Sequence, residues 1–101
     1  MSRRVRVSKK AKRDLDAIWE WVAEKGGIAA ATRVVDSITD MALSLWRFPG
    51  IGRKRDELEP DSRSFPVGNF IVYYRRRKGG IEIFRVIHGR RNQRRAWKED
   101  A

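Results

Sequence analysis

The sequence predicts a single α+β domain in which two helices precede an antiparallel sheet. Two segments with helical spacing of their apolar residues, 9–25 and 28–47, come first, and three β-rich runs follow in the second half of the chain. Because helices and strands are grouped and do not alternate, the pattern favours α+β over alternating α/β. At 101 residues the chain has room for one hydrophobic core, so residues 1–101 are expected to form one domain.

The first half is expected to form a short strand and a helical hairpin. Residues 4–7 alternate arginine and valine, which is the period of a half-buried strand, and Ser8 can cap the helix that follows. The glycine pair 26–27 ends the first helix and connects it to the second. Two helices with so short a connection are expected to pack antiparallel.

The second half is expected to form a three-stranded antiparallel meander and a short basic tail. Pro49-Gly50 ends the second helix, and the charged residues 51–62 are expected to form a loop. Gly68-Asn69 suits a tight hairpin turn, and residues 75–80 are assigned to the next turn. The predicted strands are 63–67, 70–74 and 81–87, and the polar tail 90–101 is compatible with a short helix.

Ten side chains that follow these periods should supply most of the buried core. They are Leu15, Ile18, Val22, Val34, Ile38, Leu45, Ile71, Tyr73, Ile83 and Val86.

The charge of the chain restricts its partners. Lys and Arg number 24 against 13 Asp and Glu, which gives a net charge of +11. Such a chain should meet a negatively charged partner, which leaves nucleic acid, an anionic protein surface and an acidic membrane open. Four Trp, four Phe and two Tyr are enough to nucleate a core, so the chain is not a disordered basic tail.

The residue types also indicate a compartment. The absence of cysteine excludes disulfides, thiolate zinc sites and a cysteine nucleophile, and it favours a reducing cytoplasm. The basic amino terminus continues into more charge and not into an apolar stretch, so no signal peptide is expected. No apolar run approaches the roughly 20 residues that cross a bilayer, so no membrane association is expected.

Catalytic chemistry has few candidate residues here. His88 is the only histidine, and no carboxylate pair flanks it at metal-binding spacing, so neither a metal nor a cofactor is expected. A hydrolytic triad would depend on the same histidine without a G-x-S-x-G motif. His88 could act as an acid or base near neutral pH, but a structural histidine bonded to backbone is the favoured interpretation.

Basic residues concentrate in three clusters, 53–55, 75–78 and 90–95, and Trp97 follows the last of them. Forked guanidinium groups can clamp phosphate or carboxylate, and an aromatic beside them can stack on a base. Solvated surface is the alternative for each cluster. We favour that alternative for 75–78 and leave both interpretations open for 90–95.

Four strings, in their order and spacing, resemble the ParE branch of the ParE/RelE toxin superfamily. They are Ala11–Ile18, Phe48–Arg53, Arg63–Tyr74 and Arg85–Asn92. The resemblance implies the same strand, helical hairpin and meander. It also implies a cognate, ParD-like antitoxin whose acidic, flexible carboxy-terminal segment folds over the toxin, and DNA gyrase as the target.

RelE-like relatives share the fold but cut messenger RNA on the ribosome, so fold alone cannot decide. The RelE pattern uses basic residues of the central loop, an arginine ahead of the middle meander strand, an arginine after the last strand and a tyrosine near the carboxyl end. The last three positions hold Pro66, Arg91 and Trp97 here. Proline cannot donate to a phosphate and tryptophan has no phenol, so two positions depart from the ribonuclease pattern.

These observations lead to a toxin that inhibits gyrase by binding and has no catalytic residues. Target binding is assigned to Arg90, Arg91, Arg94 and Trp97, and antitoxin binding to Trp19, Trp21, Arg63 and Arg85. The runner-up is a ribosome-dependent ribonuclease using His88, Arg91 and Arg53. A basic nucleic-acid-binding module is the third interpretation; direct binding to nucleic acid is not favoured.

Overall fold

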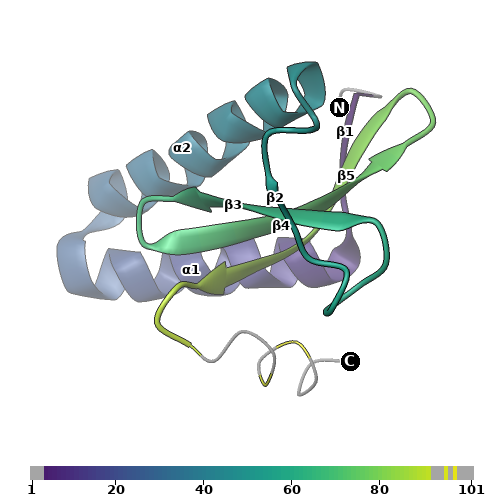
Figure 1. The fold of residues 1–101 in the computed structure, drawn as a ribbon. Helices are drawn as coiled ribbons and strands as arrows, with labels where there is room; N and C mark the ends of the chain where they lie inside the picture. Colours follow the sequence, from purple (N-terminus) through teal and green to yellow (C-terminus); the bar gives the residue numbers. More distant parts are fainter. Residues whose placement is uncertain (1–3, 92–94, 96, 98–101) are drawn as a thin grey trace.

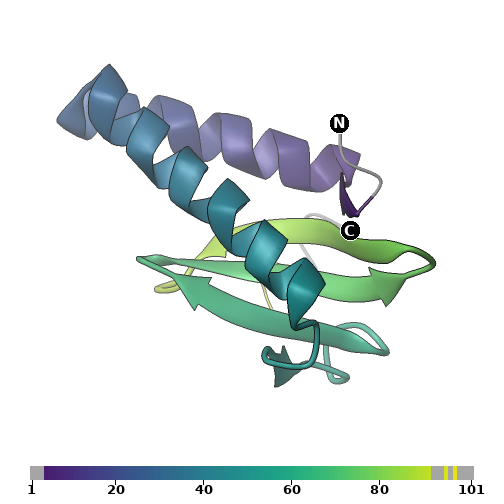
Figure 2. The same cartoon turned by 90° about the horizontal axis from the view of Figure 1, so that it is seen from above.

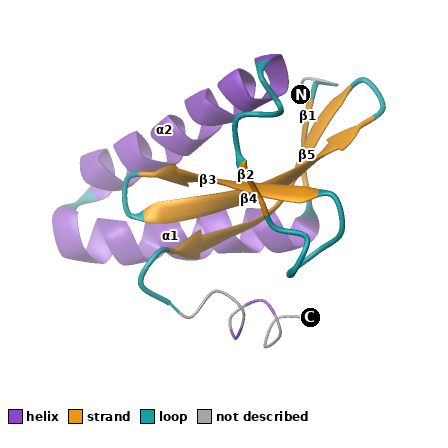
Figure 3. Cartoon of the chain, in the orientation of Figure 1, coloured by secondary structure: helices purple, strands orange, loops and turns teal. Residues whose placement is uncertain are grey.

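Two helices cover one face of a five-stranded sheet in the computed structural model, which describes residues 4–91, 95 and 97 (Figures 1 and 3). The elements are β1 (Val5–Val7), α1 (Lys9–Gly26), α2 (Ile28–Arg47), β2 (Arg53–Lys54), β3 (Ser62–Val67), β4 (Phe70–Arg77) and β5 (Gly80–His88). Seen from above, α1 and α2 form one layer and the sheet a second (Figure 2). The predicted α+β class and helical hairpin are therefore confirmed.

The sheet has the strand order β1-β5-β4-β3-β2. Strands β3, β4 and β5 form the predicted antiparallel meander, but β1 adds a parallel strand at one edge and β2 an antiparallel strand at the other. The expectation of a purely antiparallel three-stranded sheet was thus incomplete. Parallel pairing needs a long crossover, and the helical hairpin between β1 and the meander supplies it.

A glycine allows β1 to approach β5. The amide of Ile81 donates to the carbonyl of Arg4 over 2.9 Å, and a Cβ on Gly80 would collide with the backbone of Arg4. Residue 80 must therefore lack a side chain for this strand pair to form.

β4 is longer than predicted, because the arginine run 75–77 continues the strand and only Lys78-Gly79 turns. Placing 75–78 in the turn was wrong. Both Arg75 and Arg77 lie 3.3 Å from the carboxylate of Glu82 on β5. Cross-strand charge pairs of this kind stabilise a strand whose composition is otherwise polar. The 51–62 segment is also not wholly a loop, since it contains β2.

Ser8 caps α1, as predicted, and also forms hydrogen bonds with the edge of β5 just beyond the end of β1. Its hydroxyl accepts from the amide of Ala11 at 3.1 Å and donates to the carbonyl of Phe84 at 3.2 Å. Its own amide donates to the carbonyl of Ile83 at 2.9 Å. One residue thus satisfies groups of the helix end and of the sheet edge that would otherwise lack partners.

Most of the core lies between the helices and the sheet. Of the ten predicted core residues, Ile18, Ile38, Leu45, Tyr73, Ile83 and Val86 are buried, whereas Leu15, Val22, Val34 and Ile71 are half-buried. Tyr73 does not face the helices: it belongs to a smaller cluster with Ile87 on the other face, while Tyr74 joins the main core. Neighbouring residues of a strand point to opposite faces of the sheet, which places the two tyrosines in different clusters. The register between β4 and β5 also shifts between them.

Candidate functional site

A groove of about 610 Å³ lies between α1 and the end of β5. We call it the α1–β5 groove. Apolar side chains of α1, of β5 and of the start of β4 line it, among them Ile18, Val86 and Phe70. Polar residues also line it, and these are Asp14, His88, Arg90 and Arg91. The combination of apolar surface with neighbouring arginines is suited to an amphipathic, acidic segment.

An ion pair fixes α1 to β5 along this groove. The carboxylate of Asp14 accepts two bonds from Arg85, from Nε at 2.9 Å and from Nη2 at 3.2 Å. The same carboxylate accepts a hydrogen bond from the backbone amide of Val86 at 2.9 Å. This gives a partner to an amide of β5 that lies beyond the end of the pairing with β1. Arg85 is only 4% exposed. The guanidinium assigned by sequence to the antitoxin thus lies inside the molecule and bonds Asp14.

His88 lies at the end of β5 and is half-buried. Its Nδ1 accepts the backbone amide of Arg90 at 3.1 Å, as expected of a structural histidine. The ring meets Phe70 edge-on at 5.3 Å between centroids and Trp21 at 6.3 Å. His88 therefore orders the start of the segment that carries Arg90 and Arg91.

The two tryptophans of α1 differ in exposure, as their spacing predicts. Trp21 is 51% exposed beside the α1–β5 groove, whereas Trp19 is half-buried. A large aromatic side chain that remains half in solvent is a common feature of protein interfaces. Trp21 is therefore the stronger candidate for partner contact.

Trp97 packs against the sheet face that the helices leave open. Its ring meets Tyr73 edge-on at 5.1 Å and Phe84 at 5.2 Å, and the guanidinium of Arg85 lies 5.9 Å from it. Burial is the main cause that raises the pKa of Tyr73 above 10.0. The tryptophan that the sequence assigned to the target is thus half-buried in the second apolar cluster.

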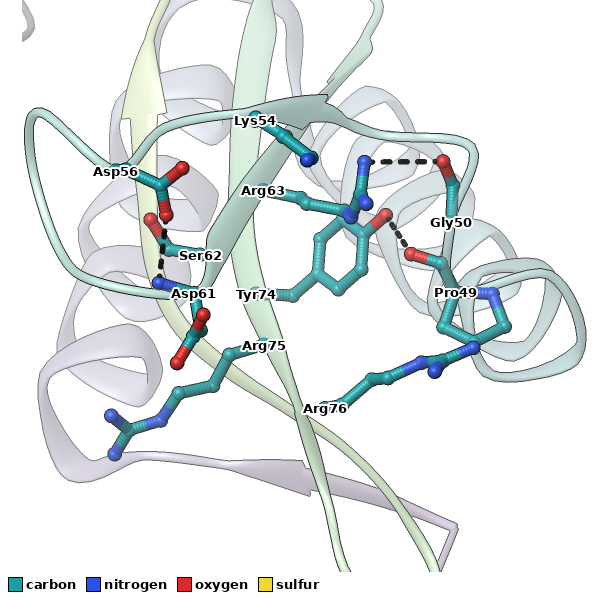
Figure 4. Close-up of a pocket in the computed structure, with 10 residues that line it drawn as sticks. All are labelled: Pro49, Gly50, Lys54, Asp56, Asp61, Ser62, Arg63, Tyr74, Arg75 and Arg76. Carbon is teal, nitrogen blue, oxygen red and sulfur yellow. Dashed lines mark hydrogen bonds between the residues drawn. The ribbon is translucent and has the colours of Figure 1, made fainter.

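A second hollow, of about 500 Å³, lies beside the turn that follows α2 (Figure 4). The phenol of the buried Tyr74 donates to the carbonyl of Pro49 at 2.8 Å and accepts the amide of Gly52 at 2.9 Å. Arg63 donates to the carbonyls of Gly50 and Gly52 at 3.3 and 2.8 Å. Burial raises the pKa of Tyr74, so its phenol keeps the proton that it donates.

The comparisons with known proteins place this fold in a family. A family model described as "ParE toxin of type II toxin-antitoxin system, parDE" matches residues 5–93. The chain belongs to the ParE toxin family. Toxin ParE3 of Caulobacter vibrioides is 34% identical over 79 residues, which are 78% of this chain and 79% of that protein. Toxin ParE1 of the same organism is 30% identical over 89 residues, covering 88% and 92%.

Solved structures agree with this assignment. A chain of the structure titled "Chromosomal ParDE TA system from P. aeruginosa" superposes with a TM-score of 0.73 at 25% identity. The match covers 84% of this chain and 94% of that chain. The family resemblance read from the sequence is therefore confirmed, and the chain is a ParE toxin of the type II toxin–antitoxin class.

Within this ParE toxin the residues predicted to bind partners fall in different places. Arg90 and Arg91 are exposed beside the α1–β5 groove with Trp21, whereas Arg63 lies in the second hollow. Arg94 lies outside the described residues.

Of the three residues of the ribonuclease alternative, His88 and Arg91 line the α1–β5 groove together, but Arg53 lies apart from them. Arg53 is on β2, and β3 and β4 separate that strand from the β5 strand that carries His88. Three strand spacings amount to roughly 14 Å. Within the described ranges 4–91, 95 and 97, no group of three or more His, Asp or Glu side chains is arranged to hold a metal ion. The helices described there are also too short or too polar to cross a membrane.

The sequence did not predict the role of Tyr74 or of the turn 49–52. The string Phe48–Arg53 was noticed for its resemblance to the family and, at Pro49-Gly50, as the end of the second helix, but not as a binding surface. Gly52 is the local signal that could have helped, because a Cβ there would collide with the Tyr74 ring and hydroxyl.

Proposed function

We propose that this ParE toxin inhibits DNA gyrase by binding it, and that a cognate antitoxin neutralises the toxin by covering the α1–β5 groove. Membership of the ParE family is the observation that carries the proposal. The proposal places the toxin in the cytoplasm, where gyrase acts on chromosomal DNA.

The groove supports the antitoxin part of the proposal. Its apolar wall can bury one face of an amphipathic segment, and Arg90 and Arg91, which the sequence analysis assigned to the target, can pair with acidic residues on the other face. A ParD-like antitoxin with an acidic carboxy-terminal segment has this chemistry. Trp21, half in solvent beside the groove, is the side chain that such a segment would cover.

The arrangement of polar side chains favours inhibition by binding over RNA cleavage. Cleavage needs a group that activates the 2′-hydroxyl, a group that protonates the leaving oxygen and a positive charge at the transition state. Arginine serves the third task, but the Nδ1 of His88 accepts a backbone amide and the side chain packs against Phe70 and Trp21. Arg53 lies across the sheet from it.

The test compares two assays on the same purified toxin: supercoiling by DNA gyrase, and messenger cleavage on translating ribosomes. We expect inhibition of supercoiling that disappears when the product of the neighbouring antitoxin gene is added in equal amount. Ribosome-dependent cleavage that is lost in His88→Ala or Arg91→Ala, with supercoiling unaffected by the intact toxin, would refute the gyrase proposal and favour the ribonuclease.

A further inference from the structure

The turn after α2 exposes large apolar side chains although it is firmly held. Phe48 is 62% exposed and Ile51 is 51% exposed, and Leu43 on the last turns of α2 is 48% exposed. Single exposed apolar residues are common on protein surfaces, but neighbouring ones on one turn are typical of a binding surface.

At least five hydrogen bonds among the described residues hold this turn in place. Four are the bonds that Tyr74 and Arg63 make to its backbone, described above. The fifth joins the amide of Ile51 to the carbonyl of Phe48 at 3.2 Å. A partner that binds here would lose little conformational entropy, because the turn is already ordered.

The hollow beside the turn is lined by four cationic side chains, Lys54, Arg63, Arg75 and Arg76, against the two carboxylates of Asp56 and Asp61, so its lining has a net positive charge. Neither Lys54 nor Arg76 forms an ion pair with any described residue, and Arg63 bonds only carbonyls. In Figure 4 the amino group of Lys54 extends toward the Arg63 guanidinium. The carboxylate of Asp56 accepts the amide of Asp61 at 2.9 Å, and among the described residues neither of these two carboxylates forms an ion pair with the cations of the hollow. A carboxylate entering the hollow would reduce the repulsion between these cations.

We propose that the 48–52 turn and the adjoining cationic hollow form a second protein-binding surface, which the toxin uses against its target. This surface takes a segment that presents a carboxylate to Lys54, Arg63 and Arg76 and an apolar side chain to Phe48 and Ile51. The inference rests on the proposed function, because it assigns the target contact of the same toxin. It also gives Arg63, which the sequence analysis assigned to the antitoxin, to the target. It shares no lining residue with the α1–β5 groove, so target and antitoxin have separate primary sites.

A protein fits this surface better than a nucleic acid does. Phosphate groups would satisfy the cations and Phe48 could stack on a base, but the aliphatic side chain of Ile51 would remain in water or contact the polar backbone of the nucleic acid. Protein interfaces combine apolar anchors with surrounding charge pairs, which is the composition seen here.

The test uses two double variants of the full chain and one matched control. Lys54→Glu/Arg76→Glu reverses the charge of the hollow, and Phe48→Ser/Ile51→Ser removes the apolar anchors. Lys10→Glu/Arg33→Glu makes the same charge change at exposed helix positions away from the turn. Each is assayed for gyrase supercoiling, for affinity to the purified cognate antitoxin, for binding to a single-stranded and a duplex oligonucleotide, and for cell killing at equal expression.

We expect both surface variants to need at least tenfold more toxin for half-inhibition of supercoiling, while the antitoxin Kd stays within threefold and the control stays within threefold in every assay. Unchanged inhibition by both variants overturns the inference. A selective loss of antitoxin affinity also overturns it, as does oligonucleotide binding that only Lys54→Glu/Arg76→Glu abolishes.

Failure of the proposed function gives a different result. If the wild-type toxin does not inhibit gyrase, the gyrase proposal fails, and cell killing then tests the second surface. Loss of killing in both variants supports the second surface, and retained killing overturns it. Should Phe48→Ser/Ile51→Ser not fold, as judged by its thermal midpoint, the charge reversal alone decides by the same criteria.

Discussion

Asp14 and Arg85 connect α1 to the sheet by a buried charge pair. The arginine side chain is 5% exposed and the aspartate side chain 17% exposed. A pair of this kind adds little stability over an apolar pair of equal size, but the loss of one partner leaves the other charge buried and uncompensated. Asp14 also accepts the amide of Val86, so its loss affects two groups at once.

Asp14→Ala should therefore lower the free energy of unfolding by about 3–5 kcal/mol. Urea unfolding followed by tryptophan fluorescence measures it. Asp16→Ala removes an exposed carboxylate from the same helix and should change stability by less than about 0.5 kcal/mol. Equal effects of the two substitutions would mean that the Arg85 guanidinium reaches solvent once Asp14 is gone.

The two tyrosines give a prediction about pH. Burial is the largest cause that raises the pKa of Tyr73 and of Tyr74 above 10.0. A pKa raised by folding stabilises the fold below the unfolded pKa, and this contribution is lost as pH rises through the folded pKa. Stability should thus fall above pH 10.0 as the tyrosines ionise.

Tyrosinate absorbance measures this directly, since these are the only tyrosines of the chain. In urea both should titrate near the ordinary value, and in the folded protein both should titrate at higher pH. Folded and unfolded curves that coincide would show that neither phenol is shielded from water.

The elements that the sequence predicts well are those in which apolar residues recur at a regular spacing over many positions. Both helices were placed within one residue of their observed bounds. β2 has two residues and no period to detect, and the pairing of β1 with β5 depends on contacts more than seventy positions apart. The arginines of β4 resemble a turn until Glu82 is known to lie opposite them.

In the candidate site, too, the sequence predicted what depends on local pattern and missed what depends on distant contacts. Residue type alone singled out Trp21, His88, Arg90 and Arg91, and the packing of α1 against β5 brings them together. Arg85 was assigned to antitoxin binding because arginine is ordinarily exposed, and its burial could not be predicted because its partner Asp14 is 71 residues distant. The cluster around Tyr74 depends on the β3–β4 register, which places Tyr74 opposite Arg63.

At the scale of elements, the α1–β5 groove predicts which tryptophan binds the antitoxin. Trp21→Ala should raise the antitoxin Kd at least tenfold, which is about 1.4 kcal/mol, because the segment loses an anchor that it would cover. Ile28→Ala is the matched control, since Ile28 is 68% exposed at the start of α2 and does not line the groove. Isothermal titration calorimetry measures the Kd of both variants. Equal Kd values for Trp21→Ala and wild type would show that the antitoxin does not bind over Trp21.

At the scale of the whole molecule, a net charge of +11 raises the question of whether the partners are held by charge alone. Salt screens exposed charge pairs, with a Debye length near 10 Å at about 0.1 M, but it does not weaken buried apolar contact. Binding to nucleic acid phosphates depends on salt far more steeply. A protein that makes six or more phosphate contacts loses roughly a thousandfold or more in affinity between about 50 and 200 mM salt.

The antitoxin complex should therefore be only partly sensitive to salt. Between about 50 and 200 mM salt we expect its Kd to rise by no more than about tenfold, because the wall of the α1–β5 groove contributes apolar contact that screening leaves intact. Titrations at several salt concentrations, with an oligonucleotide as the purely electrostatic reference, measure the slope. A slope as steep as that of the reference would mean that the arginines alone hold the antitoxin, and then Trp21 and the apolar groove would have no part in binding.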